Sequence, residues 1–197
     1  SRNSSASAAD APAGADAHAG DVTRSEDLDR WLVGADAVVV ALSIPRASAS
    51  PFARVTGPPD LHSRSASLLV DAMSRAGVRR LVKVSAQGVG DSTARTGLGF
   101  RALVAVSNLG PAFADHAVAD AIVRASSADW TIVHPPVLSD APGAGAVEAG
   151  EQVTTGTFTR LPREDLARWV VDVLPDPNWV GREVSIRPAR ASGARQP

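Results

Sequence analysis

The sequence predicts a three-layer α/β domain with a mostly parallel sheet. Short continuous apolar runs, such as residues 35–42 and 130–134, alternate with segments in which apolar residues recur at helical spacing. Continuous runs are typical of strands buried on both faces, as parallel strands between crossover helices are. With 197 residues, 44% of them hydrophobic, the chain is long enough to bury the core of one compact domain.

The first half of the chain predicts two strands and two helices. A short strand is expected at 20–22, and the Thr-x-x-Glu spacing of Thr23 and Glu26 predicts a capping box that starts a helix ending before Gly34. Residues 35–42 form the next predicted strand. A longer helix follows Asp60 and closes at Gly77, as is typical of a glycine after a helix.

The second half continues the same alternation. A strand at 80–85 is followed by a glycine-rich loop over 88–110, and Pro111 stands in the first turn of the next helix, which ends near residue 126. The Pro135-Pro136 pair stops the strand that precedes it, because proline cannot donate to a central ladder. The remaining predicted elements are short irregular strands within 147–159, a helix over 162–174 and a last strand at 184–186.

The chain divides into a low-complexity leader at 1–19, expected to be flexible, one domain at 20–187 and a loose tail at 188–197. The leader lacks the apolar segment of a secretory signal, and no apolar run approaches the roughly 20 residues of a membrane span. A net charge of −1 shows no basic excess for nucleic acid, and a chain without cysteine fits a reducing cytoplasm. We therefore expect a cytoplasmic protein with a small-molecule ligand and neither nucleic-acid nor membrane partners.

The composition also excludes several chemistries. The chain has no tyrosine and one lysine, Lys83, so no tyrosine acid can act beside a lysine. Without cysteine there is no thiolate nucleophile or cysteine-ligated metal. His18 and His62 have no partner at ligand spacing, and no metal site is predicted.

Four segments in this order resemble the atypical short-chain dehydrogenase/reductases, in particular the NmrA-like and biliverdin reductase B (flavin reductase)-like NAD(P)H-binding proteins. They are Gly-Asp-Val-Thr at 20–23, Ala-Asp-Ala-Val-Val-Val-Ala-Leu at 35–42, Gly-Val-Arg-Arg-Leu-Val-Lys-Val-Ser-Ala at 77–86 and Asp-Trp-Thr-Ile-Val-His-Pro-Pro at 129–136. The resemblance covers residues 20–187 and implies a Rossmann-like sheet that holds NADP or NAD across the carboxyl ends of its strands.

Carried over position by position, the resemblance implies three groups of cofactor contacts. Asp21 and Val22 would lie near the adenine; Ala41, Leu42 and Ser43 near the ribose and diphosphate; Ser85, Ala86, Gln87, Pro135, Pro136 and Val137 around the nicotinamide. Ser85 is the candidate polar anchor for the substrate or the nicotinamide amide.

The chain departs from the family where the family begins. A strand, a Gly-x-x-Gly-x-x-Gly turn and a helix are expected there, yet residues 1–19 show neither an apolar strand nor that turn. The predicted fold is thus N-terminally truncated, and dinucleotide binding should be weakened or absent because the helix that holds the diphosphate is lost. Either the strands at 20–22 and 35–42 pair directly, or a homodimer or partner chain covers the exposed sheet edge, or the sequence is part of a longer ancestor.

Three further features have two interpretations each. His134 is a catalytic candidate only if its ring faces the crevice, and otherwise a structural hydrogen-bonding side chain. His116 beside Asp115 suggests acid–base chemistry, but adjacent helix positions point apart, which favours a structural histidine. Gly88-Val89-Gly90 follows a strand without an expected helix, which favours a loop over the site rather than a phosphate cradle.

Two functions follow. The first is an NAD(P)H-dependent reductase acting on a small planar carbonyl or flavin-like substrate, with Ser85 and His134 as catalytic candidates. The alternative is a cofactor-independent descendant of the fold, either another class of enzyme or a binding or regulatory protein. A third possibility is a truncated product without activity. The missing glycine turn favours the alternative, whereas the strand ends at Ser85 and at Pro135-Pro136 favour the reductase.

Overall fold

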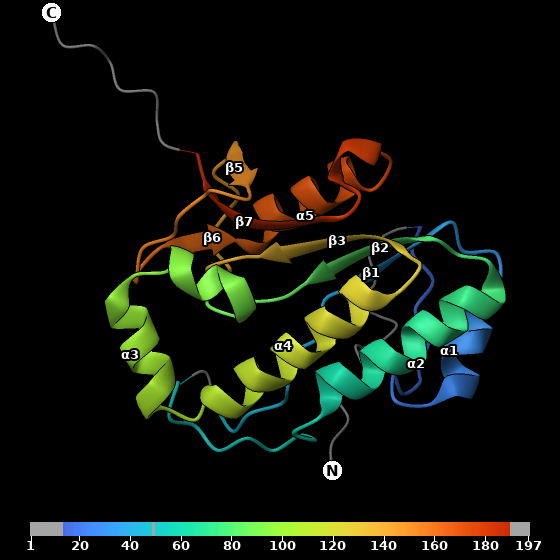
Figure 1. The fold of residues 1–197 in the computed structure, drawn as a ribbon, viewed down its shortest axis with the longest axis horizontal. Coiled ribbons are helices and arrows are strands. Elements are labelled where there is room, and N and C mark those ends of the chain that lie inside the picture. Colours follow the sequence, from blue (N-terminus) through green and yellow to red (C-terminus); the bar gives the residue numbers. More distant parts are fainter. Residues whose placement is uncertain (1–13, 49, 190–197) are drawn as a thin grey trace, which may run out of the picture.

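The core of the molecule is a five-stranded mixed sheet, shown by a computed structural model that describes residues 14–48 and 50–189. Four strands are parallel and the last is antiparallel to its neighbour (Figure 1). In sheet order they are β1 (Ala37–Val40), β2 (Arg80–Val84), β3 (Asp129–His134), β7 (Arg182–Pro188) and β5 (Val147–Gly150). The predicted Rossmann-like α/β class is confirmed.

Helices cover both faces of this sheet (Figure 1). Helices α1 (Ser25–Trp31), α2 (Leu61–Ala76) and α4 (Gly110–Ala125) lie on one face, and α5 (Arg163–Val173) lies on the other. Each crossover therefore buries an apolar helix face against parallel strands, which gives the three layers.

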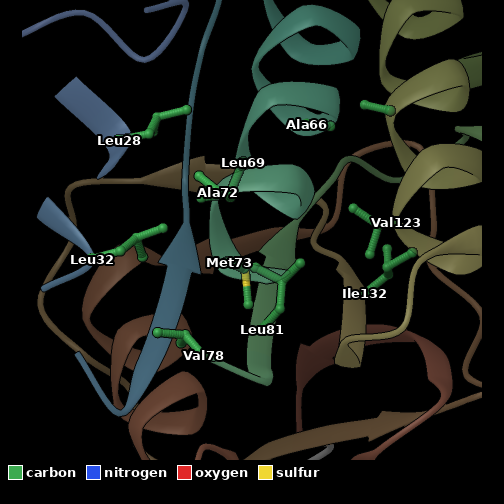
Figure 2. Packing of buried hydrophobic residues seen from close by; sticks show 11 residues of the cluster. Leu28, Leu32, Ala66, Leu69, Ala72, Met73, Val78, Leu81, Val123 and Ile132 are labelled. Carbon is green, nitrogen blue, oxygen red and sulfur yellow. The ribbon is translucent and has the colours of Figure 1, made fainter. Parts of the chain in front are cut away.

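One core fills each interface between layers. Figure 2 shows the first, in which Leu28 and Leu32 from α1, side chains of α2 and Val123 of α4 surround Leu81 of β2 and Ile132 of β3. Leu81 and Ile132 are completely buried. The second core packs α5 on the opposite face, where Trp169 meets Trp179 edge to face with ring centroids 5.2 Å apart.

Most predicted elements are present with slightly different bounds: β1 is shorter than predicted, whereas β3 and β7 are longer. Helix α2 follows Asp60 and ends at Gly77, whose φ of 72° is left-handed as expected for a closing glycine. Helix α4 carries Pro111 in its first turn, and β3 ends at His134 before the two prolines.

The glycine-rich segment 88–110 was predicted as a loop, which is wrong. It contains a 3-10 helix, η2 (Gly90–Arg95), and an α-helix, α3 (Leu98–Val106). Helix α3 buries Phe100 while leaving Leu98 and Val106 exposed. Next to it a small parallel ladder joins β4 (Val137–Ser139) to β6 (Arg160–Pro162).

The predicted strand at 20–22 and the capping box after it are also wrong. Asp21 instead closes a turn: its Oδ1 accepts the backbone amide of Thr23 at 2.8 Å and the Thr23 hydroxyl at 2.7 Å. Helix α1 then begins after Arg24, without a side-chain cap. A strand at 20–22 would need a partner strand, and β1 pairs only with β2 among the described residues.

Strand β1 is accordingly an edge strand rather than the doubly buried strand that its sequence predicts. Val39 is 44% exposed, and Val38 and Val40 are half-buried. The continuous apolar sequence of β1 is typical of a strand that pairs with neighbours on both sides. In the described part of the chain β1 has only one neighbour, β2.

Candidate functional site

Eight of the predicted cofactor residues line one of two cavities, whereas Asp21, Ser43 and Ser85 line neither. Cavity A, of about 300 Å³, follows β1 and is lined by Val22, Ala41 and Leu42 of the predicted set. Its other walls come from α1, α2 and β2, including Lys83 and Val84. Three of the five residues predicted to contact the adenine, ribose and diphosphate thus gather along the free edge of the sheet.

Cavity B, of about 420 Å³, opens at the carboxyl ends of β2 and β3. Ala86 and Gln87 follow β2, and Pro135, Pro136 and Val137 follow β3, so the structure brings together five of the six predicted nicotinamide residues, all except Ser85. The remaining lining residues are Arg46, Pro51, Phe100, Leu103, Leu109, Phe113, Thr157, Phe158 and Arg160. Aromatic and apolar walls with a few polar groups are the usual composition of a small-molecule site.

Ser85 itself is held by a buried ion pair. Lys83 Nζ lies 2.5 Å from Asp120 Oδ1, and the Ser85 hydroxyl donates to Asp120 Oδ2 at 2.7 Å. The lysine and aspartate side chains are 3% and 2% exposed. Because the Ser85 proton points to Asp120, its oxygen can still accept a hydrogen bond, but Ser85 is buried and lines neither cavity A nor cavity B.

Two histidines stack beside this ion pair, His62 from α2 and His116 from α4, with ring centroids 3.6 Å apart. Burial lowers the pKa of His62 to about 4 and that of His116 to about 2. Both rings are therefore neutral near pH 7. This geometry agrees with the structural interpretation of His116.

Asp115 explains why the dipeptide Asp115-His116 is not a catalytic pair. Its carboxylate turns toward α2 and accepts the backbone amides of His62 at 2.7 Å and Ser63 at 3.2 Å. These are free amides of the first turn of α2. The carboxylate of one helix thus caps the N-terminus of another.

His134 is buried completely, with both ring nitrogens occupied. Nδ1 lies 2.9 Å from the Ala86 carbonyl oxygen and Nε2 lies 2.9 Å from Glu183 Oε1. Burial raises the pKa of Glu183, but its contacts with His134 and Arg124 outweigh burial and lower that pKa to about 2. The ring does not face the crevice, so this geometry favours the structural alternative for His134.

The diphosphate end of the predicted site has no helix N-terminus to offer in the described residues. The first amides of α2 already hold Asp115, and in the Gly88-Val89-Gly90 segment the Gly88 amide donates to Ser92 Oγ at 2.9 Å. Ser43 lies exposed beyond β1. The residues present therefore fit the nicotinamide half of a dinucleotide better than its diphosphate.

Asp21 lies in the turn before α1, where its exposed side chain does not line cavity A. The Thr23 amide, which donates to it, lowers the pKa of the Asp21 carboxyl. Its carboxylate is thus an ionised turn-former, while its neighbour Val22 reaches the cavity wall.

Several site residues were missed by sequence reasoning. Lys83 was noted as the one lysine but not as the partner of Asp120, although a lysine inside an apolar strand needs a buried counter-charge. Arg46 and the phenylalanines of cavity B lie on loops and helices far apart in the chain, and no local pattern joins them.

Neither a metal cluster nor a membrane helix is found in residues 14–48 and 50–189. No three His, Asp or Glu side chains there gather as a metal site would require. Within the same ranges no helix combines the length and apolar character needed to cross a bilayer.

Three solved structures that share this fold illustrate the likeness. An anaerobillin reductase from Escherichia coli superposes with a TM-score of 0.69 at 17% identity, covering 89% of this chain and 76% of the other. An oxidoreductase from Lactococcus lactis gives 0.68 at 20%, covering 89% and 73%. A short-chain dehydrogenase/reductase from Veillonella parvula, solved in complex with NADP, gives 0.67 at 16%, covering 90% and 74%.

The sequence itself also matches a known family. A search of curated proteins found no match. The model of a family described as NAD(P)H-binding matches residues 1–177, which is most of the chain. The match agrees with the sheet, the crossover helices and the crevice at the strand ends, and the protein belongs to the NAD(P)H-binding family.

Proposed function

We propose that this protein is an NAD(P)H-dependent reductase of a small planar carbonyl or flavin-like substrate. The observation that carries the proposal is cavity B, where the predicted nicotinamide residues Ala86, Gln87, Pro135 and Pro136 meet at the carboxyl ends of β2 and β3. In sheets of this kind ligands bind outside the carboxyl ends of the strands. The anaerobillin reductase and the NADP complex among the similar folds support the same class.

The residues of this chain would bind the cofactor and the substrate and orient them toward each other. The cofactor, when bound, supplies the hydride. Ser85 presents an oxygen that can accept a carboxamide N–H, because Asp120 takes its proton and Lys83 holds Asp120 in place. The buried prolines after β3 and the rings of Phe100 and Phe113 keep water from the reacting face.

Binding of the dinucleotide is expected to be weak, because no free helix N-terminus stands at the diphosphate position of the described chain. The thermal midpoint of the protein, measured with and without millimolar NADPH and NADH, tests this. A ligand at about 100 times its Kd adds roughly 2.7 kcal/mol of stability. A measurable rise is expected, and the larger rise identifies the preferred nucleotide.

A matched pair of variants locates the binding site. Ala41→Glu puts a negative side chain at the end of β1, beside the predicted diphosphate position, and should abolish the rise caused by the nucleotide. Ala76→Glu makes the same change at the far end of α2, on an exposed position, and should retain it. No rise in the wild-type protein would reject the reductase in favour of a cofactor-independent descendant of the fold.

The free edge of β1 also belongs to this proposal. An unpaired parallel edge is a template for another strand. A second copy of the chain, or a partner strand, paired there would cover cavity A and build the wall that the adenine half of the ligand needs.

A further inference from the structure

From cavity B we infer that the substrate is a flat, largely apolar molecule that carries a carboxylate, bound with its anionic end toward Arg46 and Arg160 and its carbonyl toward Gln87. This inference rests on the proposed function only for the direction in which the reacting carbon faces. The binding preference itself follows from the cavity walls.

The apolar part of the wall is aromatic and closely packed. The rings of Phe100 and Phe113 lie with centroids 6.2 Å apart and tilted by 48°. Gly88, with a φ of +87°, passes beneath both, since a Cβ there would lie 3.2 Å from Phe100 and 3.6 Å from Phe113. Phe158 stands at the rim with 92% of its surface exposed. Flat ring faces favour a flat ligand.

Gln87 supplies an unpartnered polar group in this wall. The residue is 3% exposed, yet neither its amide oxygen nor its amide nitrogen has a hydrogen-bond partner in the described chain. A buried amide without partners is costly, and a ligand that pairs with it removes the cost. Its nitrogen can donate to a carbonyl oxygen, the group that a hydride acceptor of the proposed class contains.

The charges of cavity B have one sign. The ionisable residues in its lining are Arg46 and Arg160, with no carboxylate among them. Arg46 is fixed by its Nη2, which donates to the carbonyls of Ser50 at 2.7 Å and Pro51 at 2.9 Å, while its buried Nε is left without a partner. Neither arginine makes an ion pair within the described residues, so both charges are available to an anion.

The experiment compares two flat ketones that differ by one carboxylate. Isothermal titration calorimetry of the full chain, without nucleotide, measures the affinity for 2-acetylnaphthalene and for 6-acetyl-2-naphthoate. The carboxylate probe should bind more tightly, and Arg160→Gln should weaken it about fivefold while leaving the neutral ketone unchanged. Arg101→Gln, on an exposed position of α3 outside the cavity lining, is the matched control and should change neither affinity.

Gln87→Met tests the carbonyl contact, because methionine has a similar shape and no amide. It should weaken both probes, which share the ketone. Equal affinity of the wild-type protein for the two probes, no binding of either, or equal effects of Arg160→Gln and Arg101→Gln would each overturn the inference.

One added arm separates a substrate carboxylate from a cofactor phosphate. Inorganic pyrophosphate at millimolar concentration should not displace 6-acetyl-2-naphthoate. Displacement would assign the arginines to the nucleotide and overturn the inference. Because these titrations contain no nucleotide, and the NADPH measurement contains no ketone, failure of this inference is distinct from failure of the proposed function.

Discussion

At the scale of single residues, one ion pair lies buried within an otherwise largely apolar interior. Lys83 and Asp120 are both buried, and each is the counter-charge of the other. A buried ion pair adds little net stability compared with apolar residues, but removing one partner leaves an uncompensated charge. The pair therefore fixes Ser85 at the cost of sensitivity to substitution.

Lys83→Met should lower the free energy of unfolding by about 3 kcal/mol or more, because it strands the Asp120 carboxylate in the core. The double variant Lys83→Met/Asp120→Asn should recover part of that loss, since neither charge then remains. Urea unfolding of the variants followed by tryptophan fluorescence measures both values. A Lys83→Met protein as stable as wild type would show that the pair carries no such constraint.

The histidine pair predicts a loss of stability in mild acid. Both pKa values are lowered by folding, to about 4 for His62 and about 2 for His116, so between these values and 6.5 the unfolded chain binds more protons. Stability is then complete above pH 6.5 and falls as the pH drops, by about 1.4 kcal/mol per pH unit for each histidine.

Urea unfolding at pH 7 and pH 5 measures this slope. Glu183 does not affect this measurement between pH 7 and pH 5. Its pKa is lowered from 4.5 to about 2 in the folded protein, so the stability that it contributes is lost only as the pH falls below about 4.5. His116→Gln should remove about half of the slope. Gln152→Asn, on an exposed position and without any change in titratable groups, should leave the slope unchanged.

At the scale of elements, α2 and α4 are joined by more than apolar packing. Asp115 of α4 accepts two amides of the first turn of α2, whereas the side chain of Asp60, at the N-cap position itself, makes no capping bond. A cap supplied by a neighbouring helix forms only when the two helices dock. Helix α2 thus gains its N-terminal cap from tertiary structure.

Asp115→Ala should destabilise the protein by about 1–2 kcal/mol, the usual cost of a lost cap. Asp60→Ala is the control and should cost much less, because its carboxylate bonds to no amide of α2. Thermal unfolding at pH 7 compares the two. Equal losses, or a larger loss for Asp60→Ala, would assign the cap to Asp60 instead.

The sequence predicts elements well where local patterns decide them. Gly77 ends α2, and Pro111 begins α4, for backbone reasons that operate within a few residues. The prediction fails at Gly20–Val22, because a strand forms only where a partner strand is present. It also fails at α3, because the glycines of this segment predict a loop, whereas Phe100 and its neighbours form a helix beside cavity B.

The residues of the candidate site are likewise predictable only where the position of a strand end in the sequence places them. Ala86, Gln87 and the two prolines come directly after strands, so topology alone gathers them. The contacts of Ser85 with Asp120 and of His134 with Glu183 join residues 35 and 49 positions apart, and no spacing in the chain indicates them.

At the scale of the whole molecule, the two ends of the sheet differ. Both outer edges are unpaired among the described residues: one is that of the antiparallel strand β5, which pairs with β7, and the other is that of the parallel strand β1. Cavity A runs along that edge.

We expect the protein to associate through β1. Sedimentation velocity at high micromolar concentration should show a dimer, and Val39→Lys, which adds a charge to a 44% exposed position of the edge strand, should shift it to monomer. Val118→Lys, at a 53% exposed position of α4, is the matched control and should not. A monomeric wild-type protein under these conditions would contradict the expectation.

The seclusion of Lys83 has a practical consequence. The chain has a single ε-amine, that of Lys83, and in the folded protein this amine is buried between β2 and α4, where it pairs with Asp120. Amine-directed acylating reagents should therefore label the native protein only at its α-amino group, and the second label should appear at the rate at which the whole domain opens. A natural reporter of global unfolding is thus built into the strand beside the crevice.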